Sequence, residues 1–183
     1  EIPLRLVGSE MCIRDRYVTQ KAVLFAGSIR ENVFFGESAA PESDEELKNA
    51  IELSQAEEFV NKLPDGAEHM ISQMGRNVSG GQKQRLSIAR ALSRKPEILV
   101  FDDSFSALDY KTDAKLREGL NEKLKDTTKI IVAQRISTIR HADKIIVLDR
   151  GEAVGMGTHE ELMKNCDVYK EIALSQLSAA ELA

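Results

Sequence analysis

The strongest constraint on the fold is the change of pattern after Pro96. From there on, short apolar runs alternate with a helical stretch, which is typical of strands in a parallel sheet covered on both faces. The expected strands span residues 97–101, 129–133 and 144–148. Leu116, Leu120 and Leu124 recur at helical spacing between the first two strands. The sequence therefore predicts an α/β fold with a parallel sheet and flanking helices.

Polar side chains follow two of these strands. Asp102 and Asp103 come directly after the first strand, and Gln134 follows the second. Ligands of parallel sheets bind beyond the carboxyl ends of the strands. Two adjacent carboxylates there could hold Mg²⁺ through water and orient an attacking water in phosphoryl transfer. A polar turn after a strand remains an open alternative, because Asp is also a common turn residue.

The first half of the chain has helical periodicity. Residues 43–62 are expected to form one amphipathic helix, and residues 79–94 a second helix that ends before Pro96. A polar, glycine-containing stretch separates them at 65–77. Near the end of the chain, residues 149–151 predict a turn, and a capping box at 158–161 predicts a last helix.

The start of the second helix could bind an anion. Ser79 and Gln82 have the spacing of a capping box, with Gly80 and Gly81 between them. Glycines leave backbone N–H groups uncovered, and the helix dipole adds positive potential at this end, so a phosphate could dock there. A capped helix after a glycine turn, without a ligand, remains the alternative.

Composition narrows the classes of function. A net charge of −5 and a pI near 5.4 argue against nucleic acid as the main partner. Cys12 and Cys166 show no disulfide or zinc pattern, which fits a reducing, cytosolic setting. The three histidines are scattered without metal-ligand spacing, so we expect structural or solvated roles for them. The apolar runs are far shorter than the ~20 residues of a membrane-spanning helix.

Taken together and in this order, the motifs resemble the nucleotide-binding domain of ATP-binding cassette (ABC) transporters. The matching segments are Tyr17-Val18-Thr19-Gln20, residues 25–33 and 35–36, Ser79-Gly80-Gly81-Gln82, Gln84-Arg85-Leu86, residues 88–92, residues 98–103 and Ser106-Ala107-Leu108-Asp109. The stretch 27–36 resembles the exporter branch of the family. This resemblance implies a RecA-like P-loop NTPase core joined to a helical signature subdomain. It also implies ATP and Mg²⁺ as cofactors.

The resemblance further implies roles for single residues around a bound nucleotide. Gln20 would be the Q-loop residue that reaches Mg²⁺ and the attacking water, and that contacts the coupling helices of a transmembrane domain. Asp102 would be the Walker B acid at the metal, and Asp103 the catalytic carboxylate. Gln134 would stand at the switch position, and Asp109 would close the D-loop between the two nucleotide sites.

The same resemblance implies a paired assembly. Ser79, Gly80, Gly81 and Gln82 would form the signature motif, which covers the γ-phosphate of ATP held by a second cassette. Two cassettes would therefore close head to tail at the cytoplasmic face of the cell membrane, and this chain would drive export with its partner.

The chain departs from the family at its chemistry. Members that hydrolyse ATP usually have Glu where this chain has Asp103, and His where it has Gln134. Asp is shorter than Glu by roughly 1.5 Å, and Gln cannot take up a proton near neutral pH. Ser104 and Phe105 replace the usual Pro-Thr. We therefore expect a degenerate site, as in one half of a heterodimeric exporter, with an intact signature that serves the partner.

A second departure is the absence of a GxxxxGK[ST] phosphate-binding loop from the sequence. The glycine spacing from Gly75 to Gly80 imitates it, but Gly81 stands where the Lys is required and Gln82 where the Ser or Thr is. Without the backbone cradle and the Lys, we expect the 183 residues to bind ATP poorly and to be inactive alone.

The expected organisation has four parts. Residues 1–16 resemble the translation of a sequencing adapter joined to a truncated reading frame, with an unusual native N-terminus as the alternative. Residues 17–36 are the expected Q-loop segment, 37–95 the helical subdomain, and 96–183 the RecA-like core.

Two other functions remain open. One is a soluble ABC-type ATPase that acts on nucleic acid or ribosomes, which the acidic composition and residues 27–36 disfavour. The other is a catalytically silent dimerisation or regulatory module. The missing phosphate loop, Asp103 and Gln134 would all permit it.

Overall fold

The computed structural model describes residues 15–36 and 42–176. Residues 1–14, which include Cys12 and most of the expected non-native segment, lie outside this range. Two compact units divide between Val132 and Ala133, and each is described by itself.

The first unit is built on a parallel three-stranded sheet. Its strands, in spatial order, are β1 (Asp15–Val18), β4 (Ile98–Asp102) and β5 (Thr128–Val132). Tyr17 pairs with Val100, which pairs in turn with Ile130. The expected strands at 97–101 and 129–133 are thus confirmed to within one residue, and the sheet is parallel as predicted. Sequence analysis did not predict β1, because four residues with two charges show no strand pattern.

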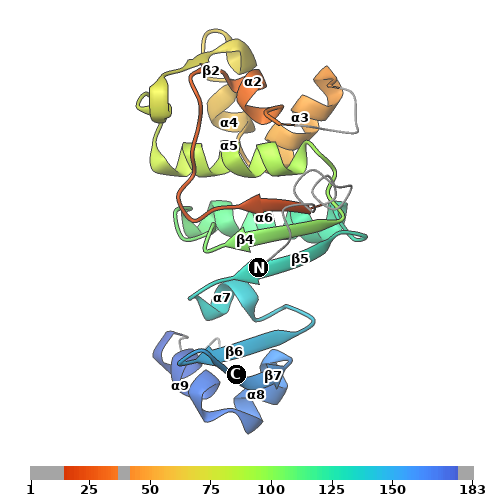
Figure 1. Cartoon of the computed structure of the whole chain (residues 1–183), viewed down its shortest axis with the longest axis vertical. Helices are drawn as coiled ribbons and strands as arrows, with labels where there is room; N and C mark the ends of the chain where they lie inside the picture. The colour runs from red at the N-terminus through yellow and green to blue at the C-terminus, as the bar shows by residue number, and fades with distance from the viewer. Residues whose placement is uncertain (1–14, 37–41, 177–183) are drawn as a thin grey trace, which may run out of the picture. The chain divides into compact units, whose positions relative to one another are not determined.

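The helices of the first unit pack beside this sheet and against one another (Figure 1). They are α2 (Ile29–Val33), α3 (Asp44–Leu53), α4 (Glu57–Val60), α5 (Gly80–Leu92) and α6 (Tyr110–Lys123). Short strands β2 (Gly27–Ser28) and β3 (Met70–Ile71) pair antiparallel, and 3₁₀ turns η2 (Gly66–Glu68) and η3 (Gln73–Gly75) flank β3. The predicted second helix is confirmed as α5, which begins after Ser79.

The prediction of one helix over 43–62 is wrong. The segment forms α3 and α4, and Gln55 between them has a φ of 59°, which lies outside the helical region. The Ser54 hydroxyl donates to the carbonyl of Ile51, and the N–H of Ala56 donates to the same carbonyl. Amphipathic spacing continued across this break because both helices bury the same side of the segment.

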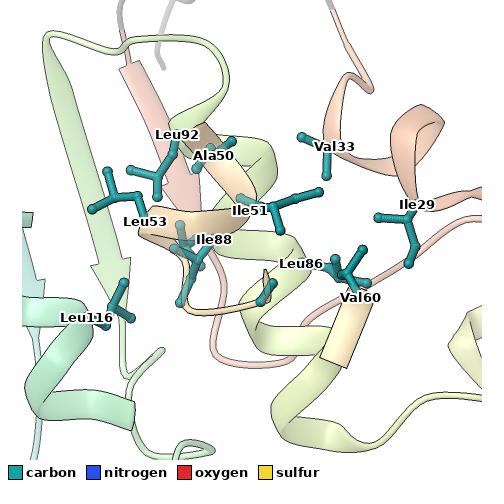
Figure 2. Close-up of a cluster of buried hydrophobic side chains, with 14 of the residues drawn as sticks. Ile29, Val33, Ala50, Ile51, Leu53, Val60, Leu86, Ile88, Leu92 and Leu116 are labelled. Carbon is teal, nitrogen blue, oxygen red and sulfur yellow. The ribbon is translucent and has the colours of Figure 1, made fainter. Parts of the chain in front are cut away.

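One apolar core joins these helices to one face of the sheet. Figure 2 shows side chains from five helices meeting in this core. The labelled residues are Ile29, Val33, Ala50, Ile51, Leu53, Val60, Leu86, Ile88, Leu92 and Leu116. Leu99 and Phe101 of β4 join the same cluster and are fully buried.

The opposite face of the sheet differs from the expectation of a sheet covered on both sides. Tyr17, Ile130 and Val132 point to this face, and each is about half exposed, at 58%, 49% and 54%. Alternating burial along β4 follows from the pleat, which sends successive side chains to opposite faces.

The second unit consists of α7 (Ile136–Ile139), β6 (Ile145–Asp149), β7 (Glu152–Gly157), α8 (His159–Asn165) and α9 (Asp167–Gln176). The strand expected at 144–148 exists, but it pairs antiparallel with β7 rather than parallel. Sequence analysis missed β7, whose Gly155 and Gly157 weaken the strand pattern. The predicted turn is confirmed, because Arg150 and Gly151 both have positive φ, as a two-residue hairpin requires.

Two local predictions in the second unit are also met. Thr158 and Glu161 form the predicted capping box of α8. His159 has the structural role expected for it, since its Nδ1 lies 2.8 Å from the hydroxyl of buried Tyr169. Burial lowers the pKa of this histidine.

Candidate functional site

Asp102 is the last residue of β4 and lies beside Tyr17 of β1. The Tyr17 hydroxyl donates a 2.5 Å hydrogen bond to Oδ2 of Asp102. Since Tyr17 pairs with Val100 and side chains alternate, Tyr17 and Asp102 share one face of the sheet. The hydrogen bond to this carboxylate raises the pKa of Tyr17. Sequence analysis missed Tyr17 because its position depends on the unrecognised strand β1.

The structure brings together Gln20 and Asp103, two residues that the sequence analysis singled out separately. Nε2 of Gln20 donates to Oδ2 of Asp103 at 2.9 Å. Asp103 has a φ of 44°, and its N–H donates to the carbonyl of Val132 at 2.8 Å. Asp tolerates this left-handed conformation better than most residues, because its short polar side chain can bond locally. The chain therefore turns sharply after β4, and both Asp102 and Asp103 lie at the carboxyl end of the parallel sheet.

The next two residues anchor this turn in the core. Ser104 is fully buried, and its hydroxyl donates to the carbonyl of Val18 at 2.7 Å. Phe105 is also buried, with its ring centroid 4.8 Å from that of Phe101. Sequence analysis identified Ser104 and Phe105 only as departures from the family, without a signal for these tertiary contacts.

Asp109 makes local contacts at the start of α6. Its carboxylate accepts hydrogen bonds from the hydroxyl of Thr112 at 2.6 Å and from the N–H of Thr112 at 3.0 Å. These bonds, the one from the hydroxyl first, lower the pKa of Asp109. Asp109 is thus the N-cap of α6, and its role in communication between nucleotide sites stays a prediction.

The Ser79–Gln82 segment begins α5 with a complete capping box. The Ser79 hydroxyl accepts from the N–H of Gln82 at 3.3 Å, and the Gln82 side chain accepts from the N–H of Ser79 at 2.8 Å. A Cβ at Gly80 would have open space around it, and one at Gly81 would lie 3.3 Å from the carbonyl oxygen of Ala107. The first turn contains no acidic residue. This end of α5 therefore keeps its positive potential and can accept an anion.

We expect Ser79→Ala to lower the free energy of unfolding by about 1 kcal/mol, because the helix loses its side-chain cap. Chemical denaturation checks this value through the shift of the midpoint. Ser79→Asp is the matched control, since it retains an acceptor oxygen and should stay close to the wild type. Equal losses in both variants would show that the cap contributes nothing.

Gln134 belongs to the second unit. Its carbonyl accepts a 2.9 Å hydrogen bond from Nε2 of Gln176, whose Oε1 accepts from the N–H of Ile136. These bonds fix the backbone of Gln134 at the start of α7. A role for its side chain in the chemistry stays a prediction.

The donor atoms at the end of β4 fit a magnesium–nucleotide ligand. Mg²⁺ prefers oxygen ligands and usually takes one or two carboxylates together with substrate phosphates. Asp102 and Gln20 supply such oxygens, and neither side chain is buried. Within residues 15–36 and 42–176, no group of three or more His, Cys, Asp and Glu could hold a metal by itself. The arrangement thus suits a metal that arrives with phosphates.

No helix in the described part of the chain is long and apolar enough to span a bilayer.

Comparison with known proteins shows the same relationship at three levels. Residues 12–106, about half of the chain, match the ABC transporter family. The chain is 47% identical over 160 residues to the uncharacterized ABC transporter ATP-binding protein YfiB of Bacillus subtilis, covering 87% of this chain and 27% of YfiB. It is 44% identical over 162 residues to an export ATP-binding/permease protein of Rickettsia felis, covering 88% of this chain and 28% of that protein.

The structural comparison adds the fold. A bacterial Atm1-family ABC exporter with ATP bound superposes with a TM-score of 0.86 at 32% identity, covering 91% of this chain and 29% of the exporter. The chain therefore spans less than a third of the length of these relatives. The α/β fold with a parallel sheet and flanking helices matches an ABC ATPase, and the chain belongs to the ABC transporter family.

Proposed function

We propose that this chain is the C-terminal part of the ATP-binding subunit of an ABC exporter. The contact of Gln20 with Asp103, next to Asp102, is the observation that carries this proposal. The amide of Gln20 and the two carboxylates lie at the carboxyl ends of the parallel strands, where such sheets bind ligands. The export designation of the Rickettsia felis relative and the Atm1-family exporter support export as the coupled process.

The relatives extend well beyond the segment that matches this chain, and the membrane part of such an exporter would lie in that additional length. We propose that the chain works at the cytoplasmic face of the cell membrane, coupled to a transmembrane domain through the Gln20 segment. A second cassette is its partner, and nucleic acid is not.

In this proposal the residues at the end of β4 divide the work. Asp102 and Gln20 would hold Mg²⁺, and the bound metal would neutralise charge on the phosphates of ATP. Asp103 orients the attacking water and accepts its proton. The Tyr17 hydroxyl donates to Oδ2 of Asp102, which leaves the other carboxylate oxygen to bind the ligand. The N–H groups at the start of α5 dock against the γ-phosphate of ATP held by the second cassette.

We further propose that this chain's own site is degenerate and that its signature serves the partner's site. The Asp103 side chain is shorter than the usual Glu by roughly 1.5 Å, and a ~1 Å displacement of a positioning group can slow a reaction on the order of a hundredfold. Gln134 cannot take up a proton as His can. Hydrolysis then occurs mainly at the partner's nucleotide, in a heterodimer. The 183 residues alone, without a phosphate-binding loop, should be inactive.

The test is a gain of function in the full-length subunit paired with itself. We expect Asp103→Glu combined with Gln134→His to raise the rate of ATP hydrolysis about tenfold, because the variant regains the longer carboxylate and a side chain that can take up a proton. Phosphate release at saturating ATP measures this rate.

Asp103→Asn in the otherwise wild-type, self-paired subunit is the control. It should leave the slow rate of ATP hydrolysis unchanged or lower it. If the self-paired wild type already hydrolysed ATP at the rate of the double variant, the degenerate-site proposal would be wrong.

A further inference from the structure

The turn that carries Gln20 is held at three consecutive residues by two segments, the loop after β4 and helix α5. The carbonyl of Val18 accepts from the hydroxyl of Ser104 at 2.7 Å. The carbonyl of Thr19 accepts from Nε2 of Gln84, a buried residue of α5, at 3.1 Å. Gln20 then donates to Asp103 at 2.9 Å. The position of Gln20 is thus fixed by its own side chain and by the backbone of the two residues before it.

Ser104 supplies the shortest of these backbone anchors. Its side chain is fully buried, and its hydroxyl lies 2.7 Å from the Val18 carbonyl but 3.3 Å from the carbonyl of Asp102. A buried hydroxyl without a partner is unfavourable, so this donor should bond persistently to Val18. The bond joins the end of β1 to the loop after β4. A Pro at position 104 has no side-chain donor and could not make it.

We infer that Ser104 is a positioning residue that compensates for the short side chain of Asp103. By tying Val18 to the loop after β4, it holds the Gln20 amide within hydrogen-bond reach of the Asp103 carboxylate. Gln84 reinforces the same turn from α5, the helix whose start carries the Ser79–Gln82 segment. The positioning itself follows from the geometry, and its effect on ATP hydrolysis rests on the proposed function.

The first test follows Gln20 directly, with no nucleotide present. In ¹⁵N-labelled chain, the side-chain amide resonance of Gln20 is assigned with a Gln20→Ala variant. We expect Ser104→Ala to shift this resonance, because the Val18 carbonyl loses its side-chain donor and the turn that carries Gln20 opens more easily.

Ser93→Ala is the matched control. Ser93 is also buried, and its hydroxyl also donates to a distant carbonyl, that of Val33 at 2.9 Å. It should lose similar stability without moving the Gln20 signals. An unchanged Gln20 resonance in Ser104→Ala, or the same change in Ser93→Ala, would overturn the inference. Ser104→Cys, nearly equal in volume and a weaker donor, should give an intermediate shift if the alanine variant unfolds.

The second test measures hydrolysis in the full-length subunit paired with itself, where the partner's competent site does not contribute to the rate. We expect Ser104→Ala to lower kcat about threefold at unchanged KM with Asp103, and to have no effect once Asp103→Glu restores the longer side chain. Equal effects in both backgrounds would reduce Ser104 to a structural role. Because the resonance of Gln20 does not depend on ATP, failure of the proposed function would leave the first test intact.

Discussion

Leu99→Ala is expected to lower the free energy of unfolding of the chain by about 2–5 kcal/mol. Leu99 lies in the middle of β4 and is fully buried in the core shared by the sheet and the helices of the first unit. Truncation removes apolar contacts and leaves a cavity, because the neighbouring helices and strands relax only partly. Since domains are stable by about 5–15 kcal/mol, this variant should lose a large share of the total. Urea unfolding followed by circular dichroism measures the loss.

Ile130→Ala on the adjacent strand is the matched control for this prediction. Ile130 is an aliphatic residue of the same sheet, but 49% of it is exposed. It should therefore lose less than about 1 kcal/mol. Similar losses for both variants would contradict the assignment of one buried and one open face to the sheet.

Gly80→Asp is expected to reduce ATP hydrolysis by the assembled exporter on the order of a hundredfold. Gly80 is the first residue of α5, and a Cβ there meets nothing within 4 Å. An Asp at this position is compatible with the fold, because acidic residues suit a helix N-terminus. The new carboxylate would, however, stand where the γ-phosphate of the partner's ATP docks, and like charges repel.

Gly80→Ala separates charge from bulk, since it adds a methyl group without a charge and should reduce hydrolysis far less. Thermal unfolding of Gly80→Asp should show stability equal to or above that of the wild type. If the folded Gly80→Asp variant hydrolysed ATP normally, the start of α5 would not contact a nucleotide.

The elements with a strong local signal could be predicted from the sequence. The capping box at Ser79 and Gln82 fixed the start of α5, and the apolar run before Asp102 identified β4. The family resemblance singled out Gln20 and Asp103 as site residues, and the contact between them is seen only in the structure.

The remaining features depend on contacts between distant segments. Strand β1 exists because it pairs with β4, which its own four residues do not reveal. Once β1 is known, Tyr17 follows as the partner of Asp102, and Val18 as the partner of Ser104. The break between α3 and α4 depends on the conformation of Gln55, which the amphipathic pattern does not record.

In the proposed exporter, the two cassettes divide the work, with hydrolysis mainly at the partner's site. The most direct test of this division is the rate of ATP hydrolysis by the purified exporter, with its partner cassette, after Asp103→Asn in this subunit alone. We expect a rate within about twofold of the wild type, because the partner's site performs most of the turnover. A loss on the order of a hundredfold or more would contradict this division and would make Asp103 the principal catalytic carboxylate.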